Sequence, residues 1–459
     1  MKHWTAQQVA AAAGASLIGS SPERGGPDRV TIDSRQAGPG SLFVGLPGAR
    51  HDGGVFAPQA LAMGAWGTLT APEHAVAEDP APARPGDSVL LTAEDPLRAL
   101  QSLATAWRRE LGAGGAQVIG VTGSTGKTST KDLLLALLAP HRRTVASRAN
   151  FNTQIGLPLE LLSAPPGTQV VVLEMAMRGT SQIAELAAIA EPDVGVIVSV
   201  GPVHLEMLGT VENVAAAKAE LIGGLAPGAV AIVPAGERLL DAHLRADVQT
   251  ITFGPGGDVR FESEDDERVV IAAQGDRIEL EVPFRQAHLR TDLLAAVAAA
   301  RAVGTTPRGR VELALSAGRG ENIPLPGGVR VIDGCYNANP MSMRAALSDL
   351  AGTAVRLGAA RRVAVLGDML ELGPSARSYH LELGELAGAA GVDLLVSVGP
   401  LAAAATERFD GESQSVADAA EAAAIVPELL QDGDLVLVKG SLGVGLKLVC
   451  EALAAGAAA

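Results

Sequence analysis

The chain of 459 residues is longer than one compact domain usually is, and at about 150 residues per domain it predicts three domains. Hydrophobic residues make up 47% of it, which excludes global disorder because sizeable cores can form. The net charge of −15 at pH 7 argues against nucleic acid or an anionic membrane surface as the main partner.

The two cysteines, Cys335 and Cys450, are too few for a disulfide framework, so we expect a cytoplasmic protein. The N-terminus holds one early lysine and no long apolar core, which predicts no signal peptide. No long apolar run is free of charges, Gly and Pro, so no membrane span is expected. Six lysines stand against thirty arginines, and in this background each lysine is a candidate for a specific role.

Apolar runs and turn residues divide the chain into three α/β stretches. Residues 1–94 hold short apolar runs broken by Gly and Pro, and they predict a small α/β domain with a loop at 73–87 near its end. Residues 95–314 predict a domain with a mainly parallel sheet, because apolar runs of strand length alternate with helical patterns. After Gly304 the β/α rhythm restarts, which marks a third domain at 315–459.

The same patterns predict the elements of the second and third stretches. In chain order they are a helix at 95–112, a strand at 118–121, a helix at 129–138, strands at 170–173 and 194–200, an antiparallel excursion over 250–285, a helix at 291–303, and strands at 329–332, 363–366, 394–398 and 435–438.

The strongest motif joins the strand at 118–121 to the helix at 129–138 through the sequence GVTGSTGKTS at 120–129. A strand, a Gly-rich loop and Lys-Thr at a helix start place backbone N–H groups and the helix N-terminus around phosphates. Lys127 would reach the β- and γ-phosphates, and the Thr128 hydroxyl a Mg²⁺ ion. A valine replaces the first Gly of the strict motif, and a Gly-rich turn that binds nothing is the alternative. The nucleotide-binding candidates are Gly123, Ser124, Thr125, Gly126, Lys127, Thr128 and Ser129.

Glu174 and His204 each follow an apolar run, at 170–173 and 194–200. In a parallel sheet the ligand site lies at the carboxyl ends of the strands, so these side chains would meet Thr128 at one edge. A carboxylate and an imidazole beside nucleotide phosphates can ligate a metal. Each alone is more often a solvated glutamate or a hydrogen-bonded structural histidine, but three successive strand ends favour a site.

Lys218 lies about two turns into an expected helix that Thr210 caps, with Glu212 in its first turn. Without further context, the default interpretation is an exposed helix lysine.

Polar residues follow strands in the third stretch as well. They are Asp333 with the segment 334–340, Asp368 and Lys439. A second ligand-facing edge is the functional interpretation, and turn formation is an equal alternative because Asn, Asp and Gly favour turns.

Taken together, these motifs resemble the Mur ligases, the ATP-dependent amide-forming enzymes of peptidoglycan synthesis. The resemblance spans nearly the whole chain. The matching segments are Asp33-Ser34-Arg35 with residues 39–44, TGSTGKTST at 122–130, residues 150–158, Glu174-Met175, His204-Leu205-Glu206, Lys218-Ala219-Glu220, YNANP at 336–340 with Ser342-Met343, and LGDMLELG at 366–373. YNANP and LGDMLELG are typical of the branch that adds D-alanyl-D-alanine to UDP-N-acetylmuramoyl-tripeptide.

The resemblance implies an α/β fold of three domains: a small UDP-binding domain at 1–94, a central P-loop ATPase domain with a mainly parallel sheet at 95–314, and a Rossmann-like domain at 315–459. It also implies that ATP phosphorylates the peptide carboxylate and that the amine of D-alanyl-D-alanine attacks the acyl phosphate. The implied cofactors are ATP, two Mg²⁺ ions and a carbamylated lysine at position 218. The expected partners are the two substrates, without nucleic acid, and the expected state is a monomer.

The resemblance implies four groups of site residues. The catalytic residues are Lys127, His204 and Lys218, and the metal ligands are Thr128, Glu174, His204 and Lys218. Beyond the loop itself, the nucleotide contacts are Asn152, Asp292, Arg319, Asp333 and Asn337. The substrate contacts are Ser34, Arg35, Asp52, Asn339 and Lys439.

Two positions depart from the family pattern. The usual His-Asn-x-x-Asn reads HLRTD at 288–292, and the usual Lys-Gly-Ser-Arg ends in Leu442. The alternatives are a sibling amino-acid-adding Mur ligase, a folylpolyglutamate synthase or, more distantly, a nucleotide switch. The sequence lacks the Asp-Asn-Pro-Arg string of the diaminopimelate-adding branch and the Asn-Lys-x-Asp string of guanine-binding switches.

Overall fold

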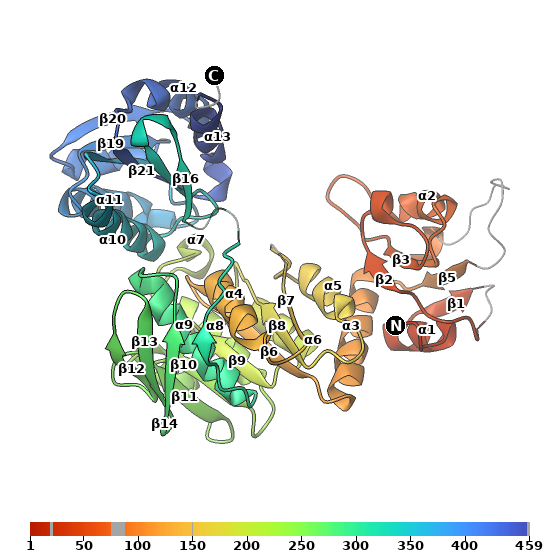
Figure 1. Cartoon of the computed structure of the whole chain (residues 1–459). Coiled ribbons are helices and arrows are strands. Elements are labelled where there is room, and N and C mark those ends of the chain that lie inside the picture. Colours follow the sequence, from red (N-terminus) through yellow and green to blue (C-terminus); the bar gives the residue numbers. More distant parts are fainter. Residues whose placement is uncertain (19–21, 75–87, 149, 317, 319, 457–459) are drawn as a thin grey trace.

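The computed structural model describes the chain except for residues 19–21, 75–87, 149, 317, 319 and 457–459. Three β-sheets with packed helices follow one another along the chain (Figure 1). The predicted fold class, α/β in three domains, is confirmed, whereas the exact domain boundaries stay a prediction. Most of the loop predicted at 73–87 lies outside the described residues. Within the described part of the chain, none of the helices has the length and apolarity that crossing a membrane requires.

The N-terminal sheet has five strands in the order β1-β5-β4-β3-β2, and β1 alone is antiparallel to its neighbour. Its elements are α1 (Ala6–Ala13), β1 (Ser16–Ile18), β2 (Arg29–Thr31), β3 (Ser41–Val44), α2 (Ala57–Ala62), β4 (Gly67–Thr70) and β5 (Val89–Thr92). Strands β3 and β4 are buried on both faces, as the inner strands of a parallel sheet usually are.

The central sheet has ten strands in the order β15-β14-β13-β12-β11-β10-β9-β6-β8-β7. The strands are β6 (Gln117–Thr122), β7 (Thr144–Ala146), β8 (Val170–Glu174), β9 (Val194–Ile197), β10 (Val230–Pro234), β11 (Gln249–Phe253), β12 (Val259–Glu264), β13 (Arg268–Ala273), β14 (Asp276–Glu281) and β15 (Gly309–Arg310). β12, β13 and β14 pair antiparallel, which confirms the excursion predicted over 250–285.

Helices cover both faces of this central sheet. They are α3 (Pro96–Ala113), α4 (Lys127–Leu138), α5 (Gly156–Ser163), α6 (Gln182–Ala190), α7 (Leu205–Leu208), α8 (Val211–Gly223) and α9 (Ala287–Ala302). Helix α9 begins four residues before its predicted start, at Ala287 instead of Thr291. No side-chain cap marks its beginning, and its first turn already buries Leu289, so the sequence offered no start signal there.

The C-terminal sheet has six strands in the order β16-β17-β21-β18-β19-β20, and β16 alone is antiparallel to its neighbour. Its elements are β16 (Glu321–Pro324), β17 (Arg330–Gly334), α10 (Pro340–Leu357), β18 (Arg361–Gly367), α11 (Ala376–Ala389), β19 (Leu394–Val398), β20 (Glu412–Val416), α12 (Ala419–Leu429), β21 (Asp434–Lys439) and α13 (Lys447–Gly456). Cys335 and Cys450 are free thiols in its core, with their Sγ atoms 3.7 Å apart.

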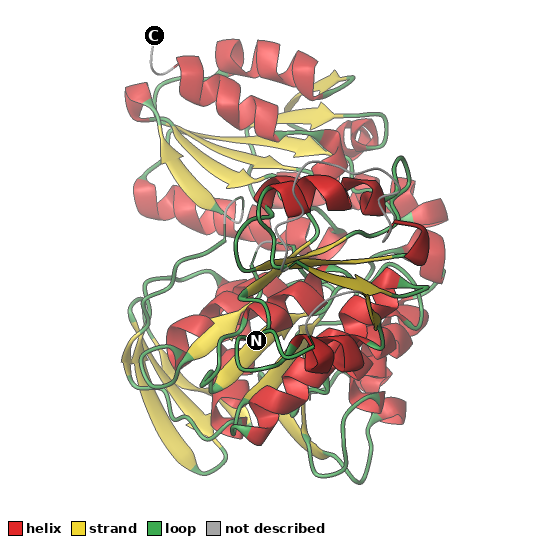
Figure 2. Cartoon of the chain, turned by 90° about the vertical axis from the view of Figure 1, so that its right-hand side faces the viewer, coloured by secondary structure: helices red, strands yellow, loops and turns green. Residues whose placement is uncertain are grey.

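Helix α3 joins the N-terminal and central domains. Its Trp107 is buried and packs edge-on against Trp4, with 5.4 Å between the ring centroids. The apolar core around Trp107 runs from α1 through α3 to α5 and α6, so these two domains share one core. Seen from the side, the N-terminal sheet stands in front of the central one (Figure 2).

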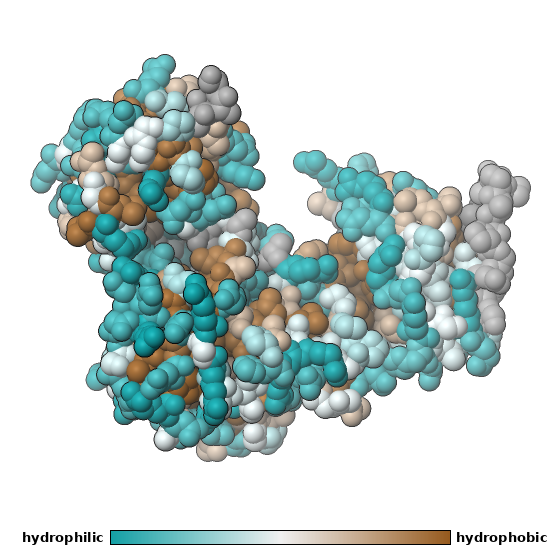
Figure 3. All heavy atoms as spheres, viewed as in Figure 1, coloured by the Kyte–Doolittle hydropathy of each residue, from teal (hydrophilic) through white to brown (hydrophobic). Residues whose placement is uncertain are grey.

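The C-terminal domain lies over the end of the central sheet where α4 begins (Figure 1). The linker to it is held on α4, because Asp132 accepts a hydrogen bond from the backbone N–H of Ser316 at 2.9 Å. Asp132 is itself buried and pairs with Lys131 at 2.6 Å. A wide hollow separates the C-terminal domain from the N-terminal one above the central domain (Figure 3).

Candidate active site

The Gly-rich loop connects the carboxyl end of β6 to the start of α4. Gly126 caps α4 with φ +81°, and a Cβ at this position would collide with the carboxylate of Asp292 and with Val198. Glycine is required here by both the backbone conformation and the close packing. The Nζ of Lys127 donates to the Gly123 carbonyl at 2.8 Å, so the cation lies over the loop.

Strand β9 supports the loop from one side. The backbone N–H of Ser124 donates to the Ser199 carbonyl at 2.9 Å, and that of Thr125 donates to the Ser199 hydroxyl at 2.8 Å. The Ser124 hydroxyl donates to the Gly201 carbonyl at 3.0 Å. These bonds hold the loop in shape, and the sequence analysis did not identify Ser199 because a lone serine after a strand carries no distinctive signal.

Strand β8 supports the loop from the other side and ends in Glu174, which is buried. Its Oε2 accepts from the Thr128 hydroxyl at 2.6 Å, and its Oε1 accepts from the Asn152 side-chain amide at 2.9 Å. Because β6 lies between β8 and β9 and all three are parallel, their carboxyl ends share one edge. The structure therefore brings Thr128, Glu174 and Asn152 together.

His204 follows β9 and has a left-handed backbone, with φ +53°. Its Nδ1 lies 2.5 Å from Oε2 of Glu371, a residue of the C-terminal domain. Burial is the largest influence on the pKa of His204 and lowers it; with the nearby Lys218 and Lys127 it outweighs the raising effect of Glu371. The imidazole is therefore neutral near pH 7, the form that can ligate a metal.

Lys218 is a buried residue of α8, a helix that Thr210 caps as predicted. The default interpretation of an exposed lysine is wrong, because the residue is only 2% exposed. Burial, and next the positive charge of Lys127, hold the pKa of Lys218 well below its ordinary value. Among the described residues, none forms a hydrogen bond or ion pair with its amine.

One residue at the strand ends of the C-terminal domain contacts the same loop, and the others bond within their own domain. Asn339 caps α10, and its side-chain amide donates to the Ser124 carbonyl at 3.4 Å across the domain boundary. Lys439 is buried and donates to the Asn337 carbonyl at 2.8 Å. Asp333 accepts from the backbone of its own turn, at 2.9 Å from the N–H of residue 335. Arg319 lies outside the described residues.

The N-terminal candidates lie in their own domain, away from the loop (Figure 1). Ser34 donates to the side-chain oxygen of Gln59 at 3.2 Å, and Arg35, which is mostly exposed, pairs with Asp33 at 2.8 Å. Asp52 accepts from the Gly54 N–H at 2.8 Å. These contacts are local, and the assignment of the three residues to a substrate stays a prediction.

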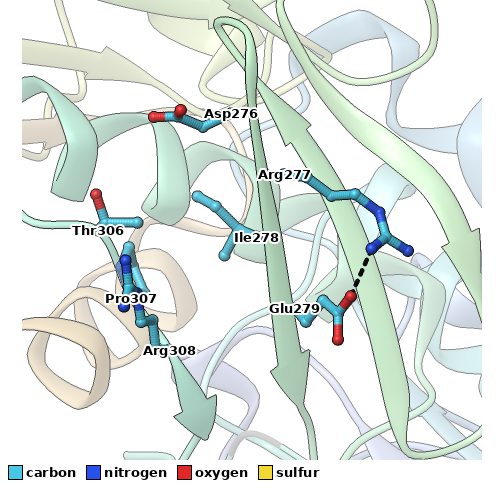
Figure 4. A pocket seen from close by; sticks show the side chains of 7 residues that line it. All are labelled: Asp276, Arg277, Ile278, Glu279, Thr306, Pro307 and Arg308. Atoms are coloured by element: carbon cyan, nitrogen blue, oxygen red, sulfur yellow. Dashed lines mark hydrogen bonds and ion pairs between the residues drawn. The ribbon is translucent and has the colours of Figure 1, made fainter.

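A separate hollow of about 410 Å³ lies between β14 and residues 306–308 (Figure 4). Arg277 and Glu279 on its wall bond to each other at 2.6 Å. None of the sequence motifs contributes to this lining, so we place no chemistry there.

Three family models match the chain. They are the catalytic domain of the Mur ligase family at residues 28–108, the Mur ligase middle domain at 121–300, and the glutamate ligase domain of Mur ligases at 318–442.

Individual relatives extend this likeness over nearly the full length. UDP-N-acetylmuramoyl-tripeptide--D-alanyl-D-alanine ligase of Mycobacterium tuberculosis is 36% identical over 98% of either chain, and the enzyme of the same name from Bacillus subtilis is 33% identical over 92% of either chain. The crystal structure of MurF from Acinetobacter baumannii superposes with a TM-score of 0.85 at 29% identity, covering 98% of this chain and 99% of that one. MurF from Thermotoga maritima in complex with ADP gives 0.78 at 28% identity, covering 93% and 96%. With three matching family models and relatives this similar along the whole chain, the protein belongs to the Mur ligase family.

Proposed function

We propose that the protein is an ATP-dependent ligase that joins D-alanyl-D-alanine to UDP-N-acetylmuramoyl-tripeptide, as one step of peptidoglycan precursor synthesis. The observation that carries this is the near full-length likeness to the mycobacterial and Bacillus enzymes of that name. The phosphate loop with Glu174 at the adjacent strand end supports the use of ATP.

The reaction has two chemical steps. The terminal carboxylate of the tripeptide attacks the γ-phosphorus of ATP, which forms an acyl phosphate and releases ADP. The free amine of D-alanyl-D-alanine then attacks the acyl carbon, loses a proton and expels inorganic phosphate. Phosphoryl transfer of this kind needs positioning and neutralisation of charge more than covalent chemistry by the protein.

The loop residues 123–129 bind and orient the triphosphate in this proposal. Lys127 neutralises charge on the β- and γ-phosphates, and backbone N–H groups at the start of α4 add to this. Asn152 holds Glu174 in place beside Thr128. Asp292, Asp333 and Asn337 are proposed to contact the nucleotide from the two sides of the interface, and Asn339 is proposed to contact the substrate.

The residues at the shared sheet edge fit divalent metal ions. Thr128 and Glu174 offer oxygen donors that are 2.6 Å apart, and His204 has a free Nε2 while Nδ1 faces Glu371. Mg²⁺ bound by these donors would neutralise charge on the phosphate oxygens. The number of ions, two, stays a proposal.

Lys218 is proposed to carry a carbamate. A neutral amine attacks the carbon of CO₂ and loses a proton, which gives an anionic oxygen ligand of the kind Mg²⁺ prefers. Its buried position and low pKa supply the neutral amine. Arginine cannot do this, because its guanidinium stays protonated.

Acceptor selectivity tests the proposed function. The measurement is inorganic phosphate released from ATP with UDP-tripeptide, comparing D-alanyl-D-alanine with single amino acids as acceptors. We expect turnover with the dipeptide only. Turnover with a free amino acid and none with the dipeptide would contradict the assignment.

We further propose that the protein is a monomer and that it acts in the cytoplasm. Light scattering on the purified protein tests the monomeric state.

A further inference from the structure

A glutamate of the C-terminal domain stands directly behind the histidine of the proposed metal site. Glu371 lies after β18, in the segment LGDMLELG at 366–373, and is separated from His204 by 167 positions in the chain. Its Oε2 lies 2.5 Å from Nδ1 of His204. The contact exists only because the C-terminal domain is docked on the central one.

The backbone segments around His204 and Glu371 lie close to each other. Both His204 and Glu371 have left-handed backbones, with φ of +53° and +63°. The backbone N–H of Glu206 donates to the Glu371 carbonyl at 3.1 Å, and a Cβ at Gly373 would meet the Glu206 Cα at 3.1 Å. Non-glycine residues keep left-handed backbones where the surroundings hold them, and such residues cluster at functional sites.

The position of the carboxylate determines which ring nitrogen is available. A carboxylate at Nδ1 accepts the proton of that nitrogen and so leaves the lone pair of Nε2 for a ligand. Arg178 pairs with the other carboxylate oxygen of Glu371 at 3.5 Å, so both oxygens of this carboxylate have a partner. Partners behind a ligating histidine orient the ring and raise its basicity.

We propose that Glu371 is a positioning residue that presents Nε2 of His204 to the metal, and that it does so only when the C-terminal domain is docked. The inference rests on the proposed function, because it takes His204 as a metal ligand. It makes docking of the C-terminal domain a condition for a complete metal site, so nucleotide chemistry and domain docking are coupled.

The chain offers a matched control for a role in docking alone. His288 on α9 pairs with Asp349 on α10 at 2.9 Å, so this pair also joins the central and C-terminal domains. It is a second histidine–carboxylate contact across the same boundary, but neither residue is a proposed metal ligand. A variant of Asp349 therefore weakens docking without touching His204.

The experiment compares Glu371→Ala, Glu371→Gln and Asp349→Asn in the full-length enzyme. The first readout is the ¹⁵N spectrum of the histidine rings without metal, with His204 assigned through His204→Ala. We expect the wild type and Glu371→Gln, which keeps an acceptor, to protonate Nδ1. Glu371→Ala should shift towards the Nε2–H form that a free histidine side chain prefers. Asp349→Asn, which keeps Glu371 but weakens docking, should shift in the same direction to a smaller extent.

The second readout is Mn²⁺ affinity by electron paramagnetic resonance, in the presence of a non-hydrolysable ATP analogue. Glu371→Ala should bind Mn²⁺ about 10- to 100-fold more weakly. Glu371→Gln and Asp349→Asn should lie in between, the second because its domains are docked less of the time. Wild-type affinity and tautomer in a folded Glu371→Ala would overturn the inference. If His204→Ala also kept wild-type affinity, the proposed metal role of His204 would fail instead, which separates the two outcomes.

Discussion

A buried lysine amine that has no hydrogen-bond or ion-pair partner is unstable as a cation. Lys218 is such a residue. The residue is 2% exposed, its amine has no hydrogen bond or ion pair from any described residue, and a second cation, Lys127, lies nearby. Burial and like charge both favour the neutral form. Lys218 therefore has the chemistry of a nucleophile or a ligand precursor rather than of a surface lysine.

Substitution of Lys218 tests this directly. We expect Lys218→Arg and Lys218→Ala each to lose at least about 100-fold in kcat, because neither side chain can form a carbamate. A small carboxylate such as formate should restore part of the activity of Lys218→Ala. The control is Lys447→Arg, which changes an exposed helix lysine paired with Glu451 at 3.8 Å and should be silent. A fully active Lys218→Arg enzyme would end the carbamate proposal.

Lys127 and Asn337 are proposed to reach the nucleotide from different domains, so their substitution should have different kinetic effects. Lys127→Ala should reduce kcat by about 1,000-fold or more, because the β- and γ-phosphates lose their main positive charge. Asn337→Ala should mainly raise the KM for ATP, because it weakens the docked state. Steady-state kinetics with varied ATP separate the two, and a near-normal rate for Lys127→Ala would refute the loop assignment.

At the scale of elements, the order of three strands assembles the site. β8, β6 and β9 are neighbours, so the residues after each of them meet, and this was predictable from apolar runs followed by polar residues. The burial of Lys218 was not predictable, because an Ala-rich helix pattern does not say which face the sheet covers. The contact of Glu371 with His204 was not predictable either, because it depends on how two domains dock.

The strand–loop–helix element of β6 and α4 depends on a glycine at position 126. Gly126→Ala should destabilise the fold by at least about 1–2 kcal/mol, the cost of a left-handed residue with a side chain, and should also abolish ATP binding by displacing Asp292. Gly228→Ala is the control: it has φ +82° but open space around it, so it should show the backbone cost alone. Urea unfolding and ATP titration of both variants check this. Equal ATP affinity in the two would argue against packing at Gly126.

At the scale of the whole molecule, docking of the C-terminal domain should depend on pH through His288. Burial and, to a smaller extent, the charge of Lys439 lower the pKa of His288. The bond to Asp349 and the negative charges of Asp349 and Asp292 outweigh both effects, so the pKa is raised above 6.5. A raised pKa means that the pair stabilises docking fully below the ordinary value and loses this as the pH rises through the raised one.

Small-angle scattering across pH 6 to about pH 9 measures this dependence. The radius of gyration should increase with pH as the domains separate more often. Asp349→Asn should flatten that dependence and show the larger radius already at low pH. An unchanged pH profile in the variant would rule out His288 as the titrating group.

Oxygen-18 transfer tests most directly whether this chain activates a peptide carboxylate as an acyl phosphate. UDP-N-acetylmuramoyl-tripeptide labelled with ¹⁸O in its terminal carboxylate is turned over with ATP and D-alanyl-D-alanine, and the released phosphate is analysed by mass spectrometry. We predict one ¹⁸O atom in each inorganic phosphate, because the attacking carboxylate oxygen leaves with the phosphoryl group. Unlabelled phosphate released in step with the amide product would contradict the proposed reaction.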